Sequence, residues 1–325
     1  MIISMLSRLL KSLPSLVAIS AITTVPVVAQ DHPPQSILCI GNSFSLHATI
    51  FLPQIAAERG HELVIGHAVI KGGSLAQHAD PAATYPVKVE VPPGNLEPTI
   101  RFPGLSTDHA EITLSEALNY RPWDVVTIQQ ASKFSFVATS YEPYATQIID
   151  LIRELQPDAK IYIHQTWAYR HDAPRLRQLG IDQREMHEGL VEAYDRLAAD
   201  HDLPQIPSGD ALNLARQQPM WQYRDDPDFD FDNPPADRLP RQDGSLIRGY
   251  FHRMDGKLAI DPYHLNPAGM YLTGCVWYQA LFEDGLGGAE WFPEGLTAEQ
   301  ASNLREIAQR AVADSADAAK GSEAH

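Results

Sequence analysis

Ser43, Asp261 and His264 are the residues whose types and spacing best fit covalent chemistry. Ser43 ends a Gly-Asn-Ser turn directly after the apolar run 37–40. Asp261 precedes His264 by three residues near the other end of the chain, and both are expected in a turn before a capped helix. A serine that a histidine deprotonates can attack an acyl carbon, and a carboxylate can hold that histidine in the required tautomer. The two segments together predict a Ser-His-Asp hydrolase, provided that the fold brings them together.

Alternating strands and helices are predicted to position these residues. Short apolar runs alternate with longer helical stretches, which is typical of a parallel sheet covered on both faces. We therefore expect an α/β fold, a three-layer α/β/α sandwich with a central, mostly parallel sheet. The predicted strands lie at 37–40, 61–70, 124–130, 159–164 and 203–206, and the predicted helices at 51–60, 113–119, 141–155, 182–199 and from Pro267 onward, with Asn266 as its cap.

Polar residues at the ends of the predicted strands could complete a site, because ligands bind beyond the carboxyl ends of the strands in such sheets. The backbone N–H groups of Ser43 and Gly72 could stabilise an oxyanion, since glycine permits close approach of the backbone. The side-chain amide of Gln130 could supply a third donor. We expect Gln129 to point to the other face of the strand.

Trp167, Tyr169 and Arg170 follow the fourth predicted strand, at the expected mouth of the site. Aromatic rings there could stack on a sugar, and an arginine could bind a carboxylate. Packing in the core is the alternative for all three side chains.

The segments around the serine and the histidine resemble those of the SGNH (GDSL-type) hydrolases. Residues 41–44 (GNSF) resemble the family's nucleophile block, Gly72 matches the glycine of the second block with Gly73 as the alternative, and DPYH resembles the final Asp-x-x-His block. The resemblance spans roughly residues 36–285. It implies a flavodoxin-like α/β/α fold and a Ser-His-Asp hydrolase, commonly an esterase or deacetylase.

The third block departs from the family pattern, which is Gly-x-Asn-Asp with the asparagine as an oxyanion donor. Here the equivalent residues 128–132 read IQQAS. The sequence is similar to a branch with a Gln-Gln-x-Ser block, and the donor role passes to Gln130, to Gln129 or to neither.

These observations predict an exported serine hydrolase that removes acetyl or similar acyl groups from carbohydrate and needs no metal or organic cofactor. One alternative is a glycan-binding protein with this fold and weak or lost catalysis. Another is a lipase or thioesterase, which would need a long apolar cleft.

The 325 residues, 44% of them hydrophobic, are organised as follows. Residues 1–29 read as a signal peptide, so we expect a periplasmic or secreted protein. Residues 30–312 are predicted to form one domain with irregular insertions near 80–112 and 217–250, and 313–325 to form a disordered tail. The net charge of −16 argues against nucleic acid and anionic membranes as partners, and a small-molecule or glycan ester remains the expected substrate. The oligomeric state is left open.

Two further features allow more than one reading. Cys39 and Cys275 lie inside a predicted strand and a predicted helix, where two buried free thiols are favoured over a disulfide. Alternating aspartates in the segment 225–232 only partly resemble a calcium loop, and a solvated acidic loop is favoured.

Overall fold

The computed structural model describes residues 36–87, 102, 110–282 and 284–322. At its centre lies a parallel sheet of short strands whose side chains are buried on both faces, as the apolar runs predict. The order is β2 (Val64–Val69), β1 (Ser36–Gly41), β5 (Val125–Ile128), β6 (Lys160–His164) and β7 (Gln205–Ile206). The prediction of an α/β fold around a central parallel sheet is confirmed.

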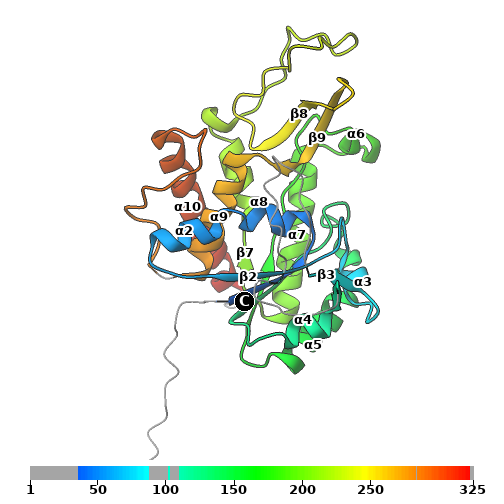
Figure 1. Ribbon diagram of the computed structural model, residues 1–325, viewed down its shortest axis with the longest axis vertical. Helices are drawn as coiled ribbons and strands as arrows, with labels where there is room; N and C mark the ends of the chain where they lie inside the picture. Colours follow the sequence, from blue (N-terminus) through cyan, green and yellow to red (C-terminus); the bar gives the residue numbers. More distant parts are fainter. Residues whose placement is uncertain (1–35, 88–101, 103–109, 283, 323–325) are drawn as a thin grey trace, which may run out of the picture. The chain divides into compact units, whose positions relative to one another are not determined.

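Helices flank the sheet (Figure 1). They are α1 (Ser43–Thr49), α2 (Leu52–Glu58), α3 (Leu75–His78), α4 (Leu114–Asn119), α5 (Tyr144–Leu155), α6 (Pro174–Leu179), α7 (Gln183–His201), α8 (Ser208–Arg216), α9 (Pro267–Leu281) and α10 (Ala298–Ser322), with 3-10 turns η1 (Ala138–Ser140) and η2 (Pro219–Trp221). Helices α1, α2, α8 and α10 contact α9, whereas α3 and α4 contact α5. No described helix is long and apolar enough to cross a bilayer.

Several helix starts follow the capping signals in the sequence. The Thr113 hydroxyl accepts the N–H of Glu116, whose carboxylate accepts the N–H of Thr113, which forms a capping box. The Asn266 side chain accepts the N–H of Gly269 at the start of α9, with Pro267 at the first helical position.

Two small antiparallel ribbons lie outside the central sheet. One pairs β3 (Thr84–Pro86) with β4 (Glu111–Thr113), and the other pairs β8 (Ile247–His252) with β9 (Leu258–Leu265). Asp261 and His264 lie within β9, whereas the sequence predicted a turn before α9. The difference arises because β8, inside the segment expected to be irregular, supplies a pairing partner.

The C-terminal end of the chain differs from the sequence-based prediction. The C-terminal helix α10 continues to Ser322 where a disordered tail was expected from 313, and it buries Ala301, Leu304 and Ala308 in the core. The predicted signal peptide, residues 1–29, and most of the insertion near 80–112 lie outside the described residues.

Cys39 and Cys275 are both free and buried, and burial raises the pKa of each thiol to about 12.

Candidate active site

The strand order places the predicted nucleophile at a topological switch point. The chain runs from β1 outward to β2 and then returns to the other side of β1 as β5, so the switch point, where such sheets bind ligands, lies beyond the carboxyl ends of β1 and β5. Ser43 opens α1 directly after β1. Asn42 caps this helix by accepting the N–H of Phe44 (2.9 Å), and its Nδ2 donates to the carbonyl of Gly73 (3.1 Å), which ties the turn to the loop after β2.

Ser43, His264 and Asp261 are joined by two hydrogen bonds although 221 residues separate the serine from the histidine. His264 Nδ1 lies 2.9 Å from Asp261 Oδ2, and His264 Nε2 lies 2.8 Å from Ser43 Oγ. An ionised carboxylate can only accept, so Nδ1 carries the proton and Nε2 accepts from the serine hydroxyl. This is the arrangement that activates a serine for attack on an acyl carbon.

Asp261 is held in its ionised form by its own strand. Burial acts to raise its pKa, but the His264 side chain and the backbone N–H groups of His264 and Tyr263 outweigh that effect and lower the pKa to about 2. The carboxylate therefore stays charged at neutral pH and fixes both the tautomer and the orientation of His264.

Gly72 lies in the loop after β2, with φ +62°, a left-handed conformation that favours glycine. The N–H of the alternative, Gly73, already donates to the Ile70 carbonyl (2.8 Å). Because the N–H of Gly73 is already engaged, Gly72 remains the expected backbone donor.

The two glutamines that follow β5 have different hydrogen-bond partners, and both side chains are buried. Gln130 Nε2 donates to the Ser140 carbonyl (2.8 Å), while its Oε1 accepts the N–H groups of Leu75 and Ala131. This amide ties α3 and η1 to the sheet rather than pointing to the nucleophile, which differs from the expectation for an oxyanion donor.

Gln129 forms hydrogen bonds with residues that follow or belong to other strands near the nucleophile. Its Oε1 accepts from Ser45 Oγ (2.6 Å) and from His164 Nδ1 (3.0 Å), and all three side chains are buried. Gly41 closes this space, since a Cβ there would lie 2.5 Å from Ser45 Oγ. Of the three side chains only Gln129 was considered in the sequence analysis, and its pairing with Ser45 and His164 required the fold.

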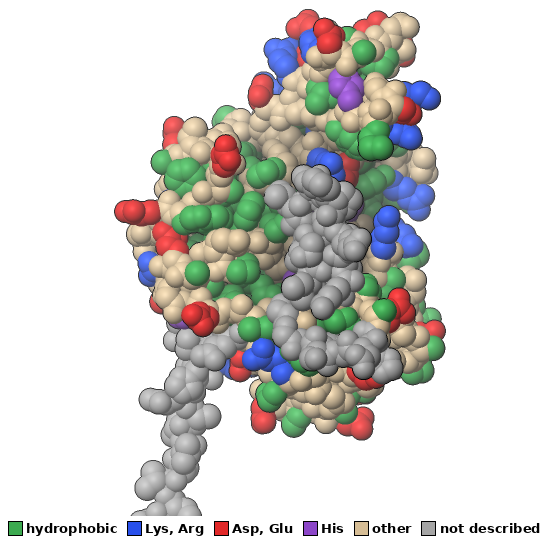
Figure 2. All heavy atoms as spheres, in the orientation of Figure 1, with side chains coloured by type: hydrophobic (Ala, Val, Ile, Leu, Met, Phe, Trp, Pro, Cys, Tyr) green, Lys and Arg blue, Asp and Glu red, His purple; other side chains and the backbone are tan. Residues whose placement is uncertain are grey.

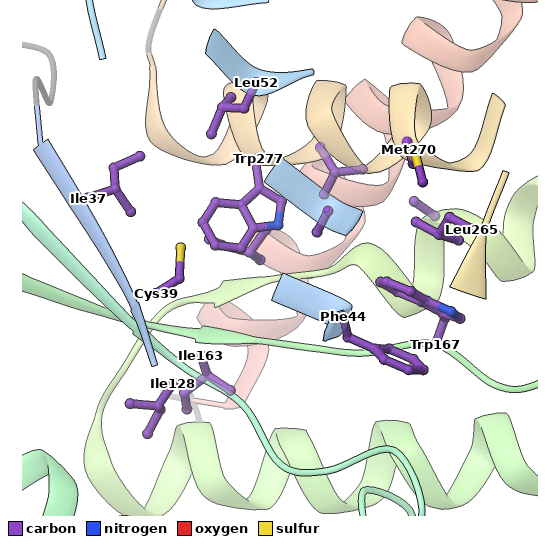
Figure 3. Packing of buried hydrophobic residues seen from close by; sticks show 14 of the residues in the cluster. Ile37, Cys39, Phe44, Leu52, Ile128, Ile163, Trp167, Leu265, Met270 and Trp277 are labelled. Atoms are coloured by element: carbon purple, nitrogen blue, oxygen red, sulfur yellow. The ribbon is translucent and has the colours of Figure 1, made fainter. Parts of the chain in front are cut away.

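The aromatic residues after β6 are buried next to the triad and do not form the rim of the site. Trp167 is fully buried, stacks on Phe44 at 4.3 Å (Figure 3), and its Nε1 donates to the Tyr263 carbonyl (2.8 Å). Tyr169 is 4% exposed and its hydroxyl is hydrogen-bonded to Ser132. Of the two alternatives, core packing holds for both rings, and neither is placed to stack on a substrate.

Arg170 is also internal. It is 2% exposed, and its guanidinium makes a bidentate contact with Asp172 at 2.7 and 2.8 Å. With its charge paired in this way, it is not free to bind a substrate carboxylate in the expected manner.

The acidic segment near 225–232 is organised by arginines. Asp226 is buried and pairs with Arg241 (2.9 Å), and Arg238 lies 3.8 Å away. Within the described ranges, no group of three or more His, Cys, Asp or Glu side chains could hold a metal ion.

One residue beside the triad has no counterpart in the sequence-based prediction. His47 lies one helical turn after Ser43 on α1, and its ring packs on that of His264. The i, i+4 spacing on one helix face was the available signal.

Comparisons with known proteins place the chain in a family. No curated protein matches the sequence at a significant level. The crystal structure of a DUF4886 family protein from Bacteroides uniformis is similar, with a TM-score of 0.64 and 26% identity over 86% of this chain and 94% of that chain.

Two esterases are more distantly similar. A family 3 carbohydrate esterase from Clostridium thermocellum gives a TM-score of 0.37 at 12% identity, covering 75% of this chain and 94% of that one. A variant of an acetyl-xylooligosaccharide esterase from Geobacillus gives 0.41 at 11% identity, covering 80% and 97%. The profile of a domain of unknown function, DUF4886, matches residues 36–230, and the chain therefore belongs to the DUF4886 family.

Proposed function

We propose that this protein is an ester hydrolase with Ser43 as nucleophile, His264 as general base and acid, and Asp261 as the orienting carboxylate. The observation that carries the proposal is the pair of hydrogen bonds from Ser43 Oγ to His264 Nε2 and from His264 Nδ1 to Asp261 Oδ2. Together with the site's place beyond β1 and β5, this pair supports acyl transfer to Ser43.

In this mechanism the Ser43 hydroxyl gives its proton to His264 Nε2 as its oxygen bonds to the acyl carbon. His264 then passes the proton to the leaving alcohol, and an acyl-serine forms. Water, deprotonated by the same imidazole, releases the carboxylic acid and restores Ser43. The N–H groups of Ser43 and Gly72 would stabilise the oxyanion of both tetrahedral intermediates.

We further propose that the substrate is a short-chain acyl ester of carbohydrate and that the protein acts after export. The exposed residues in the loops after β2 and β5 include Lys71 and Lys133 together with the apolar Phe134 and Val137, so these loops offer both polar and apolar contacts to an alcohol. The aromatic rings expected at a sugar subsite are buried, so this substrate rests on the two lysines and on the sequence of residues 1–29, which predicts export.

A fluorophosphonate probe, followed by peptide mass spectrometry, tests the chemistry. We expect covalent labelling at Ser43 in the wild type and none in Ser43→Ala or His264→Ala, with all three proteins folded. Ser45→Ala is the matched control, because Ser45 lies two residues away but hydrogen-bonds to Gln129 instead of His264. An unlabelled Ser43 in a folded wild type would contradict the proposal and favour a glycan-binding protein.

A panel of acetyl, butyryl and long-chain esters then tests the substrate class. We expect kcat/KM to fall with chain length and to be highest for acetylated sugars. A preference for long chains would contradict the carbohydrate proposal and indicate a lipase or thioesterase.

A further inference from the structure

A second candidate site lies away from the triad, beneath the ribbon of β8 and β9. It is a cavity of about 190 Å³ whose wall includes Arg170, Arg216, Trp221, Tyr223, Leu246 and Ile247. None of the three triad residues lines it. The wall thus combines two arginines with aromatic and aliphatic side chains.

Only one of the two arginines has its charge neutralised. Arg170 is held by Asp172 in a bidentate ion pair, by Gln242 (3.0 Å) and by the Tyr223 ring 4.0 Å from the guanidinium carbon. These contacts explain Arg170 as a structural residue.

Arg216, in the last turn of α8, has no such partner. Its Nη2 donates to the Ala168 carbonyl (2.9 Å), and no carboxylate among the described residues forms an ion pair with it. Asp210, on the same helix, is hydrogen-bonded to Gln165 and lies 3.4 Å from His187 instead. A partly buried guanidinium beside a cavity is costly unless an anion accompanies it.

The electrostatics around Arg216 agree with an uncompensated positive charge. Burial, and then the charge of Arg170, lower the pKa of Arg216 to about 10. Burial, and then Arg216, lower the pKa of His187 to about 4, so His187 stays neutral and adds no charge of its own at neutral pH.

The size of the cavity suits a small ligand. Its volume of about 190 Å³ is that of roughly six water molecules in the liquid, at roughly 30 Å³ each, so a molecule with a few carbon atoms fits in it. We propose that this cavity binds a short-chain monocarboxylate, with the carboxylate on the guanidinium of Arg216 and the alkyl chain against Trp221, Leu246 and Ile247. Arginine suits this role because its planar fork can donate two parallel hydrogen bonds to one carboxylate.

Calorimetric titration with sodium butyrate tests the proposal, and butyramide serves as an uncharged ligand of the same shape. The titrations use the full chain carrying Ser43→Ala, so that binding is measured whether or not the protein hydrolyses esters. We expect butyrate to bind and butyramide to bind about tenfold more weakly or worse, because charge-assisted hydrogen bonds exceed neutral ones.

Variants assign the binding to the cavity. Arg216→Gln should weaken butyrate by about tenfold or more, and Arg216→Lys should weaken it less, since it keeps the charge but loses the fork. Arg196→Gln is the matched control, because Arg196 is exposed on α7 beside Asp200 and should leave the affinity unchanged.

Three outcomes would overturn the proposal: equal affinities for butyrate and butyramide, unaltered butyrate binding by folded Arg216→Gln, or no binding up to about 50 mM, far above a useful affinity. If Arg216→Gln does not fold, the comparison of butyrate with butyramide and the Arg216→Lys variant still decide the question.

Discussion

The ring of His47 stacks on that of His264 with their centroids 4.8 Å apart and their planes at 27°. Burial, and then the charge of His264, lower the pKa of His47 to about 3. His47 therefore stays neutral at neutral pH, and in the proposed reaction we expect it to act by holding the imidazole in place.

Replacing His47 tests this positioning role. We expect His47→Ala to reduce kcat by about 10- to 100-fold with little change in KM, since small displacements of a catalytic group are costly. His47→Phe keeps a stacking ring and should recover most of the loss. His171→Ala, at an exposed histidine, is the control, and unaltered kcat in His47→Ala would contradict the role.

Gln130 should matter for stability more than for turnover. Gln130→Ala leaves the N–H groups of Leu75 and Ala131 without their acceptor, so we expect a loss of about 2 kcal/mol in the free energy of unfolding and kcat within a few-fold of wild type. Urea unfolding and ester turnover measure the two quantities. A fall in kcat of about a hundredfold at unaltered stability would instead assign Gln130 to the oxyanion hole.

Gly41 should tolerate no side chain. A Cβ at this position would lie 2.5 Å from Ser45 Oγ and 2.6 Å from Gln129 Cγ, so Gly41→Ala should destabilise the protein by about 1–3 kcal/mol and also lower kcat, because Ser43 is two residues away. Gly287→Ala, where a Cβ meets nothing within 4 Å, is the control. Thermal unfolding and turnover of both variants provide the comparison.

Acid should destabilise the protein through buried neutral histidines. Burial lowers the pKa of His47 and His164 to about 3 and that of His78 to about 4, from 6.5 in the unfolded chain. The unfolded chain therefore takes up protons first, and the contribution is complete above pH 6.5 and is lost as the pH falls toward 4 and 3. Each histidine should reduce the free energy of unfolding by about 1.4 kcal/mol per pH unit in that window.

Asp210 opposes this slope below pH 6, because burial raises its pKa to about 6 and the folded state then binds the extra proton. Urea titrations at pH 7, 6 and 5 measure the net effect. His78→Gln should reduce the slope by about one proton. Equal stability at pH 7 and 5 would contradict the argument.

The central sheet and the triad residues were accessible from the sequence because their signals are local. Apolar runs mark strands that are buried on both faces, and Asn266-Pro267 marks the start of α9. Asp261 and His264 are in contact although they lie in strand β9 and not in the expected turn. Their side chains can meet in either structure because the two residues are only three positions apart in the chain.

The surroundings of the triad could not be predicted from the sequence, because the sequence does not distinguish a buried polar or aromatic residue from an exposed one. Trp167 was expected at a rim, yet it lies between Phe44 and the Tyr263 carbonyl. Gln130 was expected to donate to an oxyanion, yet its amide donates to the Ser140 carbonyl. Ser140 lies ten residues later in the chain, in a turn that has no clear sequence pattern. Acidic and basic side chains also intermingle on the surface (Figure 2), so net charge alone located no site.

The three residues of the proposed triad lie on two different parts of the fold, one of which is the ribbon of β8 and β9. Ser43 opens α1 directly after β1 of the five-stranded sheet, whereas Asp261 and His264 lie on a two-stranded ribbon. The Trp167 side chain donates to the Tyr263 carbonyl of this ribbon, and the Arg170 N–H donates to the Pro262 carbonyl. Two strands alone are marginally stable in water. Undocking of this ribbon would separate His264 from Ser43 without breaking a strand pair of the central sheet, so we expect the proposed activity to be lost before the central sheet unfolds.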